Sequence, residues 1–256
     1  MQNQNKCELI GYYGGDKTHA LAAWSSTFEE LDVEIPTSIE DRVDVIFKYV
    51  AETKKKSCSD LLEFLAKNQH SSPFEFSYLH FQTNEDIATH IQILKHRIGI
   101  SKNTESARYK ELKEDKYYIP SDWSDVSNSA DIDVSLGFDN NIANMFGEII
   151  PKNTKWNKIL ASYTKLGNNL YHECIKDLEP VLGRKRAKES ARYFKTYNSQ
   201  VYTNMSFNFR SFIHFQHLRN SEHAQLEVRD LAQDMLNCVK SIPNNPFEHS
   251  LAAFSL

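Results

Sequence analysis

The sequence has few of the features that mark secreted, membrane-bound or disulfide-stabilised proteins. Its four cysteines lie far apart and show no paired spacing: Cys7, Cys58, Cys174 and Cys238. We therefore expect reduced thiols rather than a disulfide framework or a zinc site. No apolar stretch approaches the length of a membrane span, and the N-terminal residues lack the apolar core of a signal peptide. These absences predict a cytoplasmic protein with no membrane partner.

An excess of basic charge is also missing. The 30 Lys and Arg residues are outnumbered by 34 Asp and Glu residues, which leaves a net charge of −4. This balance gives no general attraction to nucleic acid, so any anion site must be a local basic cluster. We find no internal repeat and no low-complexity tract. A length of 256 residues is compatible with a single domain, residues 1–256.

Helical periodicity dominates the sequence. Alternating apolar residues predict strands over 74–81 and 201–209, the second leading into a helix. Residues 98–109 lack any period and are expected to form a loop, and residues 120–144, rich in Ser, Asp and Asn, a flexible insertion. Apolar spacing and capping residues predict helices over 38–56, over 59–67 with Ser59 as N-cap, from Thr83 or Asn84 to about 97, from Trp156, after Gly183, and from Ser221. Helices with a few strands between them indicate an α+β fold.

Polar residues gather in three places where a hydrophobic core does not need them. The first is His70-Ser-Ser-Pro-Phe-Glu75, directly before the first predicted strand. The second begins at a predicted helix end, with Gln92 and Lys95 on one face, and continues to Arg108. Arg and Lys can hold a phosphate dianion through charge-assisted hydrogen bonds. A basic helix end favoured by the helix dipole is the simpler alternative for this cluster taken alone.

The third cluster holds Arg192 and the segment from Asn208 to Arg219. Within it, Arg210, His214 and His217 recur at helical spacing and should point the same way. The histidines do not indicate a metal site, because there is no Glu between paired histidines and no carboxylate is placed as a ligand. We therefore expect no metal.

Together, the three clusters resemble the flavin-dependent thymidylate synthases (ThyX) in order and spacing, over roughly residues 10–235. The resemblance is carried by His70-Ser-Ser-Pro-Phe-Glu75, Gln92-Ile-Leu-Lys95-His-Arg97, Ser106-Ala-Arg108-Tyr109, Ala191-Arg192, Asn208-Phe-Arg210, His214, Arg219 and His223-Ala-Gln-Leu-Glu227-Val-Arg229. It implies a ThyX-like fold, in which helices flank a small mixed or antiparallel sheet. The region near 121–150 stands outside the resemblance as a family-specific insertion.

The sequence departs from the family pattern in three places. Lys95 stands where the signature has Arg, which keeps the charge but loses the planar fork. The stretch from Arg97 to Ser106 is one residue longer than in the family, so Asn103 matches the family's loop asparagine while its acidic neighbour falls in the 104–105 region. The Leu-Pro pair that usually follows the family's Ala-Arg is absent.

The resemblance implies methylation of dUMP to dTMP with FAD as cofactor, methylenetetrahydrofolate as carbon donor and NADPH as reductant, without a cysteine nucleophile. It also implies a homotetramer with shared active sites. By position, the residues implied to bind FAD are His70, Ser72, Glu75, His96, Arg97, Asn103, Asn208, Arg210 and His214. Those implied to bind dUMP are Gln92, Lys95, Ser106, Ala107, Arg108, Arg192 and Arg219.

Two of these residues are assigned catalytic roles. Arg219 would stabilise the negative charge that builds on the uracil carbonyls, and His70 would order a water near the flavin. Ser106 is expected to donate to phosphate rather than to act as a nucleophile. Two alternatives stay open: an FAD- and nucleotide-binding homologue without synthase activity, and an RNA- or nucleotide-binding module built on residues 95–108.

Overall fold

The computed structural model describes residues 3–26, 32–55, 57–134 and 149–256. The chain divides into two compact units. The sheet unit comprises Asn5–Asn84, Thr89–Thr104 and Tyr202–Leu256, and the hairpin unit comprises Met1–Gln4, Glu85–Ala88 and Glu105–Val201. Within the described ranges, no helix combines the length and the apolar character needed to cross a membrane.

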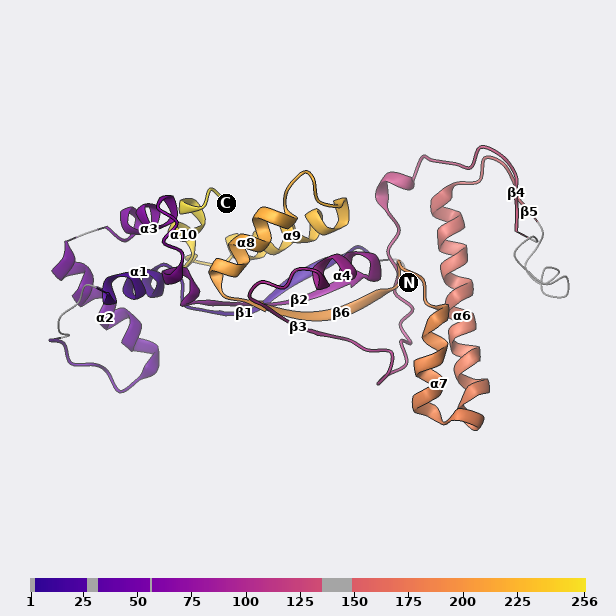
Figure 1. Ribbon diagram of the computed structural model, residues 1–256, viewed down its shortest axis with the longest axis horizontal. Helices are drawn as coiled ribbons and strands as arrows, with labels where there is room; N and C mark the ends of the chain where they lie inside the picture. Colours follow the sequence, from indigo (N-terminus) through magenta and orange to yellow (C-terminus); the bar gives the residue numbers. More distant parts are fainter. Residues whose placement is uncertain (1–2, 27–31, 56, 135–148) are drawn as a thin grey trace. The chain divides into compact units, whose positions relative to one another are not determined.

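A four-stranded sheet forms the centre of the sheet unit. Its order is β1 (Lys6–Tyr13), β2 (Tyr78–Asp86), β6 (Gln200–Phe207) and β3 (Ile100–Thr104). β1 runs antiparallel to β2, and β3 runs antiparallel to β6 with Ile100 opposite Phe207. Helices flank this sheet (Figure 1), which confirms the α+β class predicted from the sequence.

Helices α8 (Phe209–Arg219) and α9 (Leu226–Lys240) lie over one face of the sheet (Figure 1). The alternation along β6 turns Met205 and Phe207 into the core, where Phe207 meets Phe212 and Phe215 of α8. The Phe81 and Phe212 rings stack at 5.6 Å between centroids. Each such buried side chain contributes roughly 1.5–3 kcal/mol, so this aromatic layer fixes α8 on the sheet.

A second group of elements in the sheet unit packs around α1 (Asp16–Ser25). This group consists of α2 (Ile39–Lys54), α3 (Cys58–Lys67), α10 (Glu248–Ala253) and a 3₁₀ turn at Ser72–Glu75. Ala20, Trp24 and Val50 form a small core between α1 and α2. Helix α4 (Ile87–Leu94) follows β2 directly.

The hairpin unit is built on two helices, α6 (Trp156–Leu182) and α7 (Arg184–Ala191), which lie side by side (Figure 1). The turn between them is made at Gly183, whose φ of 76° favours glycine. Its core consists of Leu112, Tyr171, Ile175 and Ala191. Two short strands, β4 (Ile132–Asp133) and β5 (Ile149–Ile150), pair antiparallel, and 3₁₀ turns occupy Ser121–Trp123 and Arg192–Phe194.

Several predicted elements are confirmed, and others are wrong. The helices predicted over 38–56, from Trp156 and after Gly183, and the strand over 201–209, match α2, α6, α7 and β6. The strand predicted over 74–81 begins only at Tyr78, because Pro73 lies near the start of the 3₁₀ turn Ser72–Glu75, which buries Phe74. Thr83 and Asn84 lie inside β2 and cap no helix. Residues 100–104 form β3 instead of a loop.

Two predicted helix caps are also wrong. The N-cap of α3 is Ser57, whose Oγ accepts the Asp60 N–H at 3.4 Å, and not Ser59. The last long helix begins at Leu226 after Gln225, so Ser221 lies outside it. Residues 135–148 of the predicted insertion lie outside the described residues, and the prediction of one domain with an insertion near 121–150 stays a prediction.

Candidate functional site

A basic turn in the hairpin unit carries three of the residues predicted to bind substrate. Ser106 begins the turn, and its carbonyl accepts the Tyr109 and Lys110 N–H groups at 3.0 and 3.2 Å. Its hydroxyl accepts the Arg108 N–H at 3.3 Å. The half-buried Ala107 packs against the core of this unit. The turn therefore presents the Arg108 side chain from a backbone that is already hydrogen-bonded.

Two hydrogen bonds connect this turn to helix α7. Arg108 Nε donates to Glu189 Oε1 at 3.0 Å, and Lys188 Nζ donates to the Tyr109 carbonyl at 2.7 Å. The hydrogen bond from Arg108 holds the pKa of Glu189 below its ordinary value. Arg192 follows Glu189 by three residues at the end of α7, so both side chains project from one face. Arg186 Nη1 also lies 3.7 Å from Glu189 Oε2, so two arginines share this carboxylate.

The sheet unit brings together two segments that were predicted to bind the flavin. Glu75, at the end of the 3₁₀ turn, forms an ion pair with Arg210 of α8. Asn208 is the N-cap of α8, and its Oδ1 accepts the Ser211 N–H at 2.8 Å. Ser72 begins the same 3₁₀ turn as Glu75 and is exposed. Residues from distant parts of the chain therefore meet at the start of α8.

The basic end of α4 holds a second group. His96 is buried, and its ring lies 5.3 Å from the His214 ring of α8 between centroids. Burial lowers the pKa of His96 to about 4, and the neighbouring His214 and Arg219 add to the effect. His96 Nε2 and Arg219 Nε are two of the eight side-chain atoms that are buried without a hydrogen-bond partner among the described residues. Buried polar atoms are usually paired, so these two nitrogens are available to hydrogen-bond a ligand.

Strand β3 organises the end of α4 in a way that the sequence analysis missed. Lys102 Nζ donates to the carbonyl oxygens of Ile93, Leu94 and His96 at 3.0, 3.4 and 2.6 Å. It therefore caps the helix from the strand that follows. Asn103, the next residue, is exposed and lies opposite Asn204 of β6.

The structure joins some of the predicted residues and assigns others to different units. Glu75 contacts Arg210, and His96 contacts His214. Gln92 is half-buried on α4, whereas Lys95 and Arg97 are exposed after it. His70 is exposed with its ring near Phe64. The predicted substrate residues are divided: Gln92, Lys95 and Arg219 belong to the sheet unit, and Ser106, Ala107, Arg108 and Arg192 to the hairpin unit.

Glu189 is the functional candidate that sequence reasoning missed. It stands in Arg184-Lys-Arg-Ala-Lys-Glu-Ser-Ala191, a strongly basic helix that ends just before Arg192. The signal in the sequence was a single acidic residue, Glu189, in an otherwise basic helix. Its partner Arg108 is 81 residues away in the sequence, so the pairing itself could not be read from spacing.

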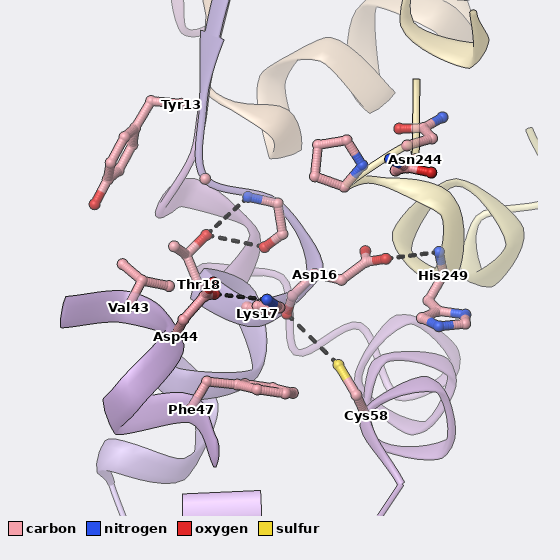
Figure 2. A pocket seen from close by; sticks show the side chains of 14 residues that line it. Tyr13, Asp16, Lys17, Thr18, Val43, Asp44, Phe47, Cys58, Asn244 and His249 are labelled. Carbon is pink, nitrogen blue, oxygen red and sulfur yellow. Dashed lines mark hydrogen bonds and ion pairs between the residues drawn. The ribbon is translucent and has the colours of Figure 1, made fainter. Parts of the chain in front are cut away.

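Two hollows lie in the sheet unit, and Glu75 of the predicted site lines only the second. Figure 2 shows the first, of about 610 Å³, where Asp16 and Lys17 face Asp44, Cys58 and His249. No residue of the predicted site lines it. The second, of about 990 Å³, is bounded by apolar side chains of α1 and α2 and by the segment from Glu75 to Tyr78.

Comparisons with known proteins identify relatives of this chain. The flavin-dependent thymidylate synthase of Treponema denticola is 28% identical over 182 residues, which cover 71% of this chain and 62% of that protein. The enzyme of the same name from Gluconobacter oxydans is 28% identical over 213 residues, 80% of this chain and 64% of that protein. Each match thus spans less than two thirds of the relative's length.

A solved structure shares the fold along the whole chain. The UMP/dUMP methylase PolB from Streptomyces cacaoi, bound with 5-Br dUMP, superimposes with a TM-score of 0.66 at 19% identity, covering 99% of this chain and 96% of that one. The family profile of the thymidylate synthase complementing proteins, Thy1, matches residues 8–244. Since that match covers nearly all of the chain and includes all three polar clusters, the protein belongs to the thymidylate synthase complementing protein family.

Proposed function

We propose that the protein is a flavin-dependent thymidylate synthase, which methylates dUMP to dTMP with methylenetetrahydrofolate as carbon donor and NADPH as reductant. The observation that carries this proposal is a pair of buried nitrogens without a hydrogen-bond partner among the described residues, His96 Nε2 after α4 and Arg219 Nε at the end of α8. Family membership over residues 8–244 and the names of the relatives in Treponema denticola and Gluconobacter oxydans support it.

The residues of the sheet unit suit a flavin with its phosphates. Arg210 and Arg97 offer guanidinium groups for phosphate, and His96 offers a buried ring nitrogen as hydrogen-bond partner. Asn208 keeps its side-chain amide N–H available while its Oδ1 caps α8. The proposed set also includes His70, Ser72, Glu75, Asn103 and His214. The FAD, when bound, supplies the redox chemistry that amino-acid side chains lack.

The proposed dUMP site has an anchoring part and a reacting part. Arg108 and Arg192 would hold the phosphate, helped by Ser106 and Ala107 of the basic turn. Gln92, Lys95 and Arg219 would face the nucleoside, and Arg219 would stabilise negative charge on the uracil carbonyls as it develops. His70, exposed and close to the 3₁₀ turn, would order a water near the flavin.

Two of the four cysteines are poorly suited to serve as the nucleophile. Burial raises the pKa of Cys58 to about 11 and that of Cys7 well above its ordinary range. Both thiols are therefore protonated near neutral pH and poor nucleophiles. The same proposal includes a homotetramer with shared active sites, as the family resemblance implies. It also includes a cytoplasmic location, which the scattered cysteines and the lack of a signal peptide core predict.

The spectrum of the purified protein tests the proposal most directly. We expect a yellow protein whose flavin spectrum changes on addition of dUMP, and formation of dTMP from dUMP, methylenetetrahydrofolate and NADPH, measured by chromatography. A yellow protein that responds to dUMP without forming dTMP would be a homologue without synthase activity. A colourless protein with salt-sensitive affinity for RNA would overturn the proposal in favour of an RNA-binding module.

A further inference from the structure

His19 of α1 lies in the core of the sheet unit and is completely buried. Both of its ring nitrogens are hydrogen-bonded, Nδ1 to the Ser250 hydroxyl and Nε2 to the Ser77 hydroxyl, each at 2.8 Å. Burial lowers the pKa of His19 to about 3, so the ring is neutral near pH 7. A neutral imidazole donates from one nitrogen and accepts at the other.

Asp16 sets the direction of these bonds. Its carboxylate accepts the His249 and Ser250 N–H groups at 2.8 Å each and the Ser250 hydroxyl at 2.5 Å (Figure 2 shows the bond to His249). Because Ser250 donates its only proton to Asp16, it must accept from His19 Nδ1–H. His19 Nε2 is then the acceptor for the Ser77 hydroxyl. The chain of donation therefore runs from Ser77 through His19 and Ser250 to Asp16.

The position of His19 links the two segments that meet at the Glu75–Arg210 ion pair. Its ring lies 5.2 Å from the Phe74 ring and 5.2 Å from the Phe209 ring, between centroids. Phe74 precedes Glu75 in the 3₁₀ turn, and Phe209 precedes Arg210 in α8. Ser77 follows Glu75 by two residues and is buried. His19 thus packs against both segments and hydrogen-bonds to one of them.

We propose that His19 is a positioning residue for the flavin side of the active site, acting through the Ser77 hydroxyl. Apolar packing alone could fill this space, but it is not directional. A fully satisfied buried hydrogen-bond network favours one arrangement of the segments it joins. The bond to Ser77 fixes the 72–77 segment so that Glu75 meets Arg210 beside Asn208. This role rests on the proposed function, since it concerns the affinity for FAD.

The test compares buried hydroxyls inside and outside the network. Ser77→Ala removes the bond to His19, whereas Thr164→Val removes a buried hydroxyl of the hairpin unit that bonds to Leu160 and Asn198. FAD is added to the flavin-stripped full-length protein and its Kd is measured by fluorescence quenching, alongside the Tm. We expect both variants to lose Tm, but only Ser77→Ala to raise the Kd for FAD, by roughly fivefold, the equivalent of about one hydrogen bond.

Two further variants establish that Ser77 acts through His19. His19→Leu should raise the Kd for FAD as Ser77→Ala does, and the double variant should raise it no further, because both changes break the same bond. Ser77→Thr keeps the hydroxyl, and its extra methyl group can enter the hollow of about 990 Å³ that Ser77 lines. This variant should restore the affinity of the wild type.

The outcomes separate this role from the proposed function. Equal Kd values for Ser77→Ala and Thr164→Val, or additive effects of His19→Leu and Ser77→Ala, would overturn the positioning role while leaving the synthase proposal intact. If His19→Leu does not fold, the comparison of Ser77→Ala, Ser77→Thr and Thr164→Val decides alone. A wild-type protein that binds no FAD would overturn the proposed function and this role with it.

Discussion

Arg108 Nε and Glu189 Oε1 lie 3.0 Å apart, so a guanidinium proposed to bind the dUMP phosphate already holds a carboxylate of its own chain. The arginine side chain is 47% exposed and the glutamate side chain 17%. A phosphate dianion arriving at Arg108 must compete with Glu189 for the same donors. The free energy that this ion pair contributes to the free protein is lost when phosphate replaces Glu189, and the loss weakens substrate binding.

Glu189→Gln should accordingly lower the KM for dUMP. Ion pairs near the surface are weak, which predicts a decrease of at most about fivefold with little change in kcat. The matched control is Glu179→Gln, which removes a carboxylate paired with Arg184 at 3.0 Å in the same helical hairpin. Steady-state kinetics at varied dUMP check both. A raised KM in Glu189→Gln would mean that the glutamate binds the substrate itself.

Arg219 and Arg192 should respond differently to removal. Arg219 has a buried Nε without a partner among the described residues, as expected of a donor that waits for developing charge. We expect Arg219→Ala to lower kcat by roughly a hundredfold or more. Arg192→Ala should mainly raise the KM for dUMP, since it removes a ground-state phosphate contact. Measuring kcat and KM for both variants tests this division of roles, and identical profiles would refute it.

Acid should destabilise the protein through His19. Its pKa falls from 6.5 to about 3 on burial, so only the unfolded state takes up this proton between those values. The free energy of unfolding therefore loses about 1.4 kcal/mol per pH unit from this group as the pH falls through the window, and is unaffected by it above pH 6.5. Urea unfolding of the wild type and of His19→Leu, at several pH values from neutral to acid, isolates this contribution. If the free energy of unfolding changed with pH in the same way in the wild type and in His19→Leu, the prediction would be contradicted.

Gly99 should be irreplaceable where the chain passes from the end of α4 into β3. Its φ is +59°, and an added Cβ would meet Ser211 Oγ at 1.8 Å and Ser211 Cβ at 2.6 Å. Gly183 has a φ of +76° but open space around it, which makes Gly183→Ala a control for the backbone alone. A strained backbone of this kind costs roughly 1–3 kcal/mol. Gly99→Ala should lose clearly more stability than Gly183→Ala in chemical denaturation, and equal losses would show that Ser211 moves aside.

The long helices were predictable because their apolar residues recur along one face over many turns. In α6 the spacing of Ile159, Tyr163 and Leu166 predicts the helix from the sequence alone. Strand β3 gave no such signal, because it lies at the edge of the sheet and carries Ser101, Lys102 and Asn103 in its middle. An edge strand exposed to solvent needs no apolar alternation, and its place is set by pairing with β6.

Recognition of the site depended on matching residues to a family rather than on spacing alone. The basic clusters could be found in the sequence, but for the one at residues 92–108, taken alone, an ordinary solvated helix end was the simpler interpretation. Contacts between distant residues, such as Glu75 with Arg210 or Arg108 with Glu189, depend on tertiary packing and have no local sequence signature. His19 was missed for the same reason, since nothing around it in the sequence shows that two serines from distant elements enclose it.

The cap that Lys102 places on α4 has a consequence for ligand affinity. The ammonium group ties three carbonyl oxygens at the helix end to a strand that is itself paired with β6, so the segment from Leu94 to Ser101 is held at both ends. Little backbone freedom is left there for a ligand to remove. Preorganisation of this kind lowers the entropic penalty of association, and a nucleotide or flavin meeting His96 and Arg97 would find their backbone already in place.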